Sequence, residues 1–133
     1  MNNLFKFTVL ILLTISTQAV GNENFFKEAK NLFDKGKIEE SKFLFQRNIV
    51  FNPKDSKSYL YLAKIYEKEE NEVEKEKNIN TTLLLEPDNE EAMYMLIDVK
   101  LKKSDFEQVK KLRNDFKVIC KILCSKVKSI DER

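Results

Sequence analysis

Two proline-bounded helix ends lie 34 residues apart in this chain, at Asn52-Pro53 and Glu86-Pro87. Each follows a segment that opens on an aromatic residue and carries apolar residues at helical spacing. A fixed period of this length indicates repeated helical hairpins, which bury their apolar faces only against neighbouring repeats. The period therefore predicts an all-α protein built from antiparallel helical hairpins, and it constrains the architecture more than any other feature.

The first 19 residues have the pattern of an export signal and are set apart from the fold. Lys6 precedes an apolar run from Phe7 to Ile15, and small or polar residues follow up to Ala19. This order is typical of a signal peptide at residues 1–19, so we expect cleavage after Ala19, with Gly21 as an alternative. The apolar run is shorter than the roughly 20 residues that span a bilayer, so we expect no membrane contact after cleavage. A membrane anchor formed by the uncleaved segment is the alternative.

The rest of the chain, residues 20–133, is expected to form one helical domain. Glycine and proline are scarce there, and apolar residues recur at helical spacing. The predicted helices span about residues 24–35, 38–51, 56–69, 72–85, 90–103 and 105–120, followed by a C-terminal helical piece. Asn89 and Asp105 lie where the helices after them need N-cap residues.

Residues at corresponding places in each hairpin carry a family resemblance. The first unit has Phe25, Ala29, Leu32, Gly36, Ser41, Phe45 and Pro53, the second has Tyr59, Leu62, Ala63, Tyr66, Ile79 and Pro87, and the third has Met93, Leu96, Phe106 and Val109. This order resembles the tetratricopeptide repeat (TPR). The resemblance implies a short right-handed superhelical solenoid of about three units, at residues 22–55, 56–89 and 90–121, with a C-terminal cap at 122–133.

Several positions depart from the TPR pattern. Glu28 and Asn48 occupy places where the family has apolar or small residues, and Lys75 occupies a small-residue place. Lys100 and Arg113 replace aromatic residues in the third unit, which suits a terminal repeat with a polar outer face. An ordinary helical bundle without superhelical stacking is the alternative architecture.

The resemblance also implies a binding surface, because TPR domains hold peptides on the concave face formed by the first helix of each hairpin. The implied groove residues are Phe26, Lys30, Phe33, Leu60, Lys64, Glu67, Tyr94, Asp98 and Leu101. Three of them, Phe26, Leu60 and Tyr94, recur every 34 residues and are expected to form an apolar stripe. A protein or peptide partner with apolar anchors fits such a groove.

The chain has two cysteines, Cys120 and Cys124, and two interpretations of them stay open. An exported protein can carry a disulfide between them, which is easier if the sixth helix ends near Cys120. Apolar residues at helical spacing from Phe116 to Ile130 instead favour an unbroken helix, in which both cysteines are small buried side chains.

The composition argues against catalysis, cofactors and nucleic acid. The chain has no histidine, the commonest general acid or base, and no phosphate-binding glycine loop. Structural zinc needs four ligands, so two cysteines without histidine predict no metal site. The 24 basic and 22 acidic residues are interspersed rather than gathered in a basic patch, so no nucleic-acid partner is expected.

These features predict a non-catalytic protein–protein interaction scaffold, exported to the cell envelope of a bacterium and most simply to the periplasm. A structural component that self-associates, or that assembles into an envelope complex, is the alternative function. Either function would act through surfaces of the helical array rather than through a reactive side chain.

Overall fold

The computed structural model describes residues 25–132 of the 133-residue chain. Over this range the backbone forms seven α-helices and no strand. The helices are α2 (Phe25–Asp34), α3 (Ile38–Phe51), α4 (Ser56–Lys68), α5 (Glu72–Leu85), α6 (Glu90–Lys102), α7 (Phe106–Ile119) and α8 (Lys126–Asp131). The six predicted helices are confirmed to within one residue. The predicted signal peptide, residues 1–19, lies outside the described residues.

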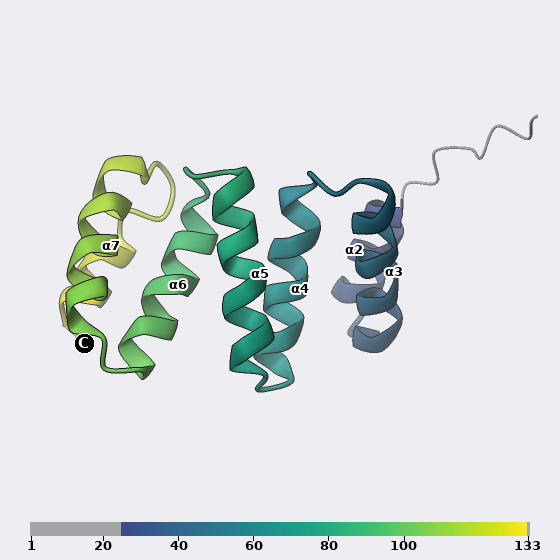
Figure 1. The fold of residues 1–133 in the computed structure, drawn as a ribbon, viewed down its shortest axis with the longest axis horizontal. Helices are drawn as coiled ribbons and strands as arrows, with labels where there is room; N and C mark the ends of the chain where they lie inside the picture. Colours follow the sequence, from purple (N-terminus) through teal and green to yellow (C-terminus); the bar gives the residue numbers. More distant parts are fainter. Residues whose placement is uncertain (1–24, 133) are drawn as a thin grey trace, which may run out of the picture.

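Consecutive helices lie side by side and form the hairpins α2/α3, α4/α5 and α6/α7 (Figure 1). Successive hairpins pack through α3 against α4 and through α5 against α6, and α8 packs against α7 at the C-terminal end. Each hairpin therefore contacts only its neighbours, as in other repeat proteins. The result is a short helical solenoid, as the 34-residue period predicts.

Side-chain caps and left-handed residues set the helix boundaries. The side chains of Asn89 and Asp105 each accept a hydrogen bond from the backbone amide three residues later, as predicted for N-caps. Gly36, Glu70 and Ser104 end the first helix of the three hairpins with φ angles of 76°, 57° and 55°. These three positions repeat with the same 34-residue period, but only the first carries the glycine that adopts this conformation freely.

The core runs along the solenoid as three clusters of buried side chains. One cluster joins α2, α3 and α4, the next joins α4, α5 and α6, and the third joins α6, α7 and α8. Ala29 and Ala63 are fully buried, as expected for small residues where paired helices approach closely. The backbone carbonyl of Ala29 even accepts a hydrogen bond from the Ser41 hydroxyl, at 2.9 Å, across the first hairpin.

The two buried polar residues that depart from the TPR pattern, Asn48 and Lys75, have polar partners. The buried Asn48 amide donates to Asp55 at 2.7 Å and to the Ser58 hydroxyl at 2.8 Å. The ammonium of Lys75, which has no exposed surface, donates to Glu67 at 2.8 Å. Within residues 25–132, every buried side-chain nitrogen or oxygen atom has a hydrogen-bond partner. These departures are therefore compatible with a packed interior.

Of the two interpretations of the cysteines, the disulfide is confirmed and the unbroken C-terminal helix is wrong. Helix α7 ends at Ile119, and Cys120 has extended backbone, so the chain turns before α8 begins. Cys120 and Cys124 are bonded, with their Cα atoms 5.2 Å apart. Phe116 and Ile130 still reach the same buried cluster, because α8 folds back against α7. Apolar spacing favoured the unbroken helix, because helical spacing shows which residues share a buried face and not where the helix ends.

Candidate functional site

A groove of about 580 Å³ runs along the first helices of the three hairpins. It is lined by Phe33 of α2, by Lys64, Glu67 and Lys68 of α4, by Glu91, Tyr94, Met95 and Asp98 of α6, and by Leu123 and Lys126 at the C-terminal end. None of these ten lining residues comes from α3, α5 or α7. The groove therefore lies on the face where the TPR resemblance places partner binding.

Five of the nine predicted groove residues line this groove: Phe33, Lys64, Glu67, Tyr94 and Asp98. Leu60 belongs to the core cluster between α4 and α6 and is not among the residues that line the groove. Phe26, Lys30 and Leu101 are half-buried and lie outside the groove lining. The role of the predicted residues in partner binding stays a prediction.

Phe26 packs inward rather than into the groove. Its ring lies 5.7 Å from the Phe45 ring and 5.8 Å from the Tyr61 ring. Lys30, one turn further along α2, forms an ion pair with Asp34 at 2.5 Å, and the hydrogen bond from Lys30 to this carboxylate raises the pKa of the lysine. The predicted apolar stripe of Phe26, Leu60 and Tyr94 is therefore mostly part of the core, and Tyr94 is its one member in the groove.

The acidic side chains of the groove are paired with lysines. Glu91 lies 2.8 Å from the ammonium of Lys64. Glu67 lies 2.8 Å from the ammonium of Lys75, and Asp98 lies 3.9 Å from the same ammonium. Lys75 belongs to α5, which does not line the groove, but its ammonium contacts these two carboxylates of the groove lining. The three carboxylates therefore add little net negative charge to the groove.

Two lysines of the groove have a different environment. The ammonium of Lys68 lies 5.9 Å from the centroid of the Phe33 ring, and that of Lys126 lies 5.7 Å from the centroid of the Tyr94 ring. These are the distances of cation–π contacts. Among residues 25–132, no carboxylate lies within ion-pair distance of either ammonium. The groove thus offers two cations beside aromatic rings.

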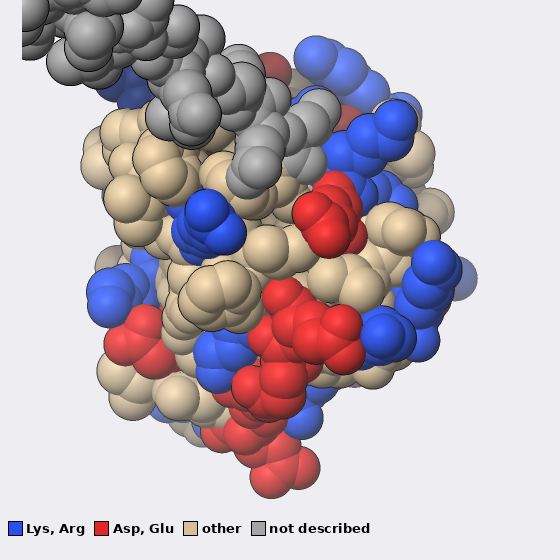
Figure 2. Space-filling model, turned by 90° about the vertical axis from the view of Figure 1, so that its right-hand side faces the viewer, with Lys and Arg blue, Asp and Glu red and all other residues tan. Residues whose placement is uncertain are grey.

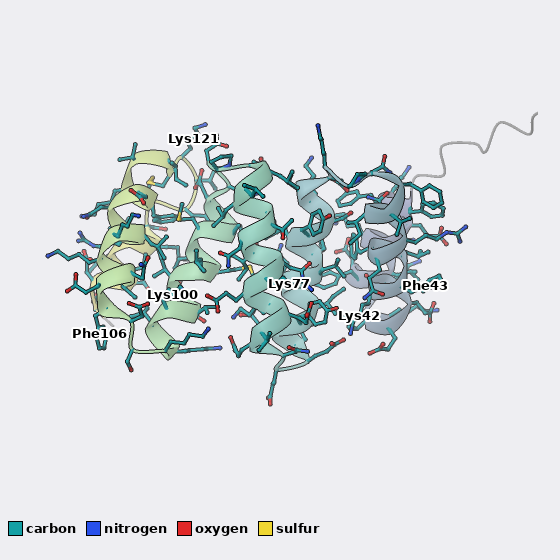
Figure 3. All side chains as sticks on the ribbon, in the orientation of Figure 1. Lys42, Phe43, Lys77, Lys100, Phe106 and Lys121 are labelled. Atoms are coloured by element: carbon teal, nitrogen blue, oxygen red, sulfur yellow. A yellow bond between two sulfur atoms is a disulfide. The ribbon has the colours of Figure 1, made fainter. Side chains whose placement is uncertain are left out.

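The carboxylate of Glu90 binds the backbone of the segment that forms the C-terminal end of the groove. Glu90 accepts hydrogen bonds from the backbone amides of Lys121, Ile122 and Leu123, at 2.8, 3.0 and 2.7 Å. These bonds, the one from Leu123 foremost, lower the pKa of Glu90 because they favour the ionised carboxylate. The same segment is closed by the Cys120–Cys124 disulfide, and Lys121 marks its position above α6 and α7 (Figure 3).

Five residues of the groove lining are not among the nine predicted groove residues: Lys68, Glu91, Met95, Leu123 and Lys126. Lys68 follows Lys64 by four residues, so helical spacing could have placed both on one face. Leu123 and Lys126 could not be found in that way. They reach the groove only because the chain turns after α7.

A second, smaller hollow of about 460 Å³ lies at the opposite end of the solenoid, on the first hairpin. It is lined by Glu28, Leu32, Glu39, Glu40, Phe43 and Leu44. Figure 2 shows this end of the molecule, where acidic side chains gather beside uncharged surface. Phe43 is 62% exposed there, and Val50 and Phe51 on the same helix are also exposed. This end is thus a second candidate contact surface.

The described residues show no arrangement suited to metal binding or to crossing a membrane. Within residues 25–132, no three His, Cys, Asp or Glu side chains are grouped so that they could hold a metal ion. None of the helices in that range is both long enough and apolar enough to cross a bilayer. The side chains that line the groove offer apolar surface and charged groups.

No protein-family model matches this chain, and no curated protein matches it in sequence. Solved structures do match. The Yersinia enterocolitica type III secretion translocator chaperone SycD is similar over 94% of this chain and 89% of its own, with a TM-score of 0.74 and 18% identity. SycD in complex with a peptide of the translocator YopD gives a TM-score of 0.73 at 16% identity, covering 83% of this chain and 88% of SycD.

A eukaryotic domain is similar as well. The TPR2B domain of yeast Sti1, in its complex with pHsp70, has a TM-score of 0.69 and 16% identity, and the match covers 83% of this chain and 90% of that domain. At these identities the likeness concerns the fold. This shared fold agrees with the paired helices, with the 34-residue period, and with the residues of positive φ that end the first helix of each hairpin. The chain has a tetratricopeptide-repeat-like fold.

Proposed function

We propose that this chain is a non-catalytic scaffold that binds a peptide, or an extended segment of a partner protein, in the groove along α2, α4 and α6. One observation carries the proposal: the groove combines the apolar side chains of Tyr94, Met95 and Leu123 with two lysines that have no carboxylate partner among the described residues. Apolar anchors with a few polar contacts are the usual basis of peptide recognition in grooves.

Similar structures support the proposal. SycD was solved with a peptide of YopD, and the second TPR domain of human RPAP3 was solved with the HSP70 peptide SGPTIEEVD. Peptides thus bind to proteins of this fold in both bacteria and eukaryotes. The TPR resemblance also includes a form called the carboxylate clamp, whose Lys, Asn and Arg positions are occupied in this chain by Phe26, Lys30, Tyr61, Glu91 and Met95. This form does not suit the chain, because Lys30 alone has a suitable charge and is paired with Asp34.

Photocrosslinking in the cell tests the proposal. A photoreactive residue replaces Lys68, which lines the groove, and a matched control replaces Lys77, an exposed lysine on the second helix α5 (Figure 3). Leu60 is unsuitable for the probe because it is buried. A partner captured from Lys68 and not from Lys77 supports a groove scaffold. Capture from neither site, or from both equally, contradicts it.

Self-association is a second candidate function, favoured by the exposed Phe43 and Phe51 at the end of the array. If the crosslinked species contain only further copies of this chain, an assembly role should replace the peptide scaffold. Sedimentation of the purified protein over a range of concentrations gives an independent measurement. Substitution of Phe43 by Ser should reduce association if this end is the contact surface.

We also propose that the protein works in the periplasm of a bacterium. The signal-like pattern of residues 1–19 supports export, and so does the Cys120–Cys124 disulfide, since such bonds persist in oxidising compartments. Cell fractionation with N-terminal sequencing tests this proposal. A mature protein that begins at Val20 or just after Gly21 supports it, whereas a protein in the cytoplasmic fraction that begins at Met1 contradicts it.

A further inference from the structure

The C-terminal end of the groove is built by a segment that lies outside the three hairpins. Leu123 and Lys126 follow the end of α7 and belong to the disulfide-closed turn and to the start of α8. Both nevertheless line the groove beside Tyr94 and Met95 of α6. We call these four residues the C-terminal corner. It places an ammonium group, an aromatic ring and two aliphatic side chains around one end of the groove.

Lys126 is the one charged residue among the four of this corner, and no carboxylate of the described residues pairs with its ammonium. Glu91 forms an ion pair with Lys64, and Glu67 forms one with Lys75, so these two groove carboxylates already have cationic partners. Within residues 25–132, the contact found for the Lys126 ammonium is with the face of the Tyr94 ring, 5.7 Å away. A cation held in this way is available to a carboxylate that approaches from the groove, and the adjacent apolar side chains can bury a neighbouring aliphatic or aromatic group.

We propose that the C-terminal corner is a subsite for an acidic side chain next to an apolar one, so that the partner is an acidic and apolar peptide. The inference deepens the proposed function and rests on it. The far end of the groove has a similar pair, Lys68 over the ring of Phe33. A second acidic side chain would fit there, with the apolar residues of the peptide between the two lysines.

Glu90 is a positioning residue for this subsite. Its carboxylate holds the three backbone amides of residues 121–123, and the disulfide bridges the ends of the same turn. Together these bonds fix the place from which the Leu123 side chain and the Lys126 ammonium reach the groove. Loss of Glu90 should therefore weaken selectivity for acidic peptides even though Glu90 is not itself a groove-lining residue.

The test is a selection from a phage-displayed library of random dodecapeptides on the purified chain. We expect the selected peptides to be enriched in Glu or Asp beside Leu, Ile or Phe. Selection on the K126Q variant should reduce this acidic enrichment, because only the Lys68 end of the groove then keeps its cation. The K128Q variant is the matched control, because Lys128 is an exposed lysine of the same helix that lies outside the groove and near Glu132, so its selection should resemble that of the unaltered chain.

The outcomes separate the inference from the proposed function. Selected peptides without acidic enrichment, or with the same enrichment on K126Q, overturn the acidic subsite and leave the peptide scaffold standing. If no peptide is enriched above background, both are overturned. Competition by 10 mM inorganic phosphate, as a probe of simple anion binding, should not displace a selected peptide. Complete displacement would mean that the corner holds any small anion, which also contradicts the inference.

The role of Glu90 is tested with one selected peptide and its Glu-to-Gln version. The unaltered chain should bind the acidic version about two- to fivefold more tightly, the range of a partly exposed ion pair. The E90Q variant and the C120S/C124S double variant should each reduce that ratio toward one while keeping the helical circular dichroism spectrum. An unchanged ratio in both variants would show that neither the carboxylate nor the disulfide positions Lys126.

Discussion

The interfaces on either side of the second hairpin differ in chemistry. Between the first and second hairpins, three phenylalanine rings surround Tyr61 of α4, with centroid distances of 5.8 Å to Phe26, 5.2 Å to Phe33 and 5.0 Å to Phe45. Between the second and third hairpins, the described residues include no such ring pair, and aliphatic side chains pack there instead. We call these the aromatic interface and the ionic interface.

Ion pairs cross the ionic interface along its whole length. They are Lys64 with Glu91 at 2.8 Å, Lys102 with Glu72 at 2.9 Å, Lys100 with Glu76 at 2.5 Å, Lys103 with the same Glu76, and Lys75 with Asp98 at 3.9 Å. The aromatic interface has its own ion pair, Lys42 with Glu69 at 2.7 Å. The difference is that a lysine with no exposed surface, Lys75, lies inside the ionic one.

The comparison shows that one repeat fold tolerates two ways of joining its units. Ring packing depends little on salt or pH, whereas ion pairs weaken as salt screens them and as carboxylates are protonated. The ionic interface also sets the charge of the groove, because Glu67 and Asp98 line the groove and contact Lys75. A change in this interface should therefore affect both stability and binding, and a change in the aromatic interface mainly stability.

The largest expected effect comes from the aromatic interface. Phe45 is fully buried between α2, α3 and α4, so Phe45→Ala should lower the free energy of unfolding by about 3–5 kcal/mol. Phe43→Ala is the matched control on the same helix, and it should change the free energy by less than about 0.5 kcal/mol because its ring is exposed. Urea unfolding followed by circular dichroism measures both. Equal effects would mean that this interface does not depend on the buried ring.

The next effect comes from the centre of the ionic interface. Lys75→Ala should cost about 1–3 kcal/mol, because it leaves a cavity and removes the cation beside Glu67 and Asp98. Lys75→Met keeps most of the volume without the charge, and it should cost less or nothing, since buried ion pairs repay their desolvation poorly. If Lys75→Met is as harmful as Lys75→Ala, the charge itself is what stabilises the interface. Urea unfolding followed by circular dichroism measures the free energy of unfolding of both Lys75 variants.

A smaller effect is expected at the turns that lead into the two interfaces. Glu70 has a φ of 57°, at the position that Gly36 occupies in the first hairpin with a φ of 76°. Glu70→Gly should therefore raise the free energy of unfolding by about 0.5–1 kcal/mol, because glycine adopts this conformation without a steric cost. Gly36→Ala should have the opposite sign. A destabilised Glu70→Gly variant in thermal unfolding would contradict this account.

The smallest effect distinguishes the interfaces by pH. Hydrogen bonds from Lys100 and then Lys103 hold the pKa of Glu76 below its ordinary value of 4.5. The stabilisation is therefore present above about pH 4.5 and is lost as the pH falls through the lower pKa of the folded protein. Glu76→Gln should cost about 0.5 kcal/mol at pH 7 and should reduce the loss of stability at acidic pH.

Thermal unfolding between pH 7 and pH 3 measures this effect. Glu74→Gln is the matched control on the same helix, because Glu74 pairs only with the exposed Lys77 among the described residues. In 1 M NaCl the difference between Glu76→Gln and the unaltered chain should become smaller, since salt screens the two ion pairs. An unchanged pH profile in Glu76→Gln would mean that Glu76 does not contribute to the acid sensitivity of the ionic interface.

Much of the fold could be predicted because its determinants are local. Helix ends followed from Pro53, Pro87, Asn89 and Asp105, which act on backbone groups within a few residues of themselves. The groove was harder to predict. Leu60 lies on the same helical face as Lys64 and Glu67, four and seven residues later, yet it is buried in the core cluster that α4 shares with α5 and α6. The spacing of residues on one helix does not show which of them a neighbouring helix covers.

The sequence by itself determined the helices, their pairing into hairpins and the face on which a groove could form, because a 34-residue period repeats the same local geometry. Only the tertiary structure decided which charged residues could be buried and how the groove ends. Lys75 is buried because carboxylates from α4 and α6 surround it. Leu123 and Lys126 reach the groove because Glu90 of α6 and the disulfide hold the turn after α7, and such contacts between distant residues leave no periodic trace in a single sequence.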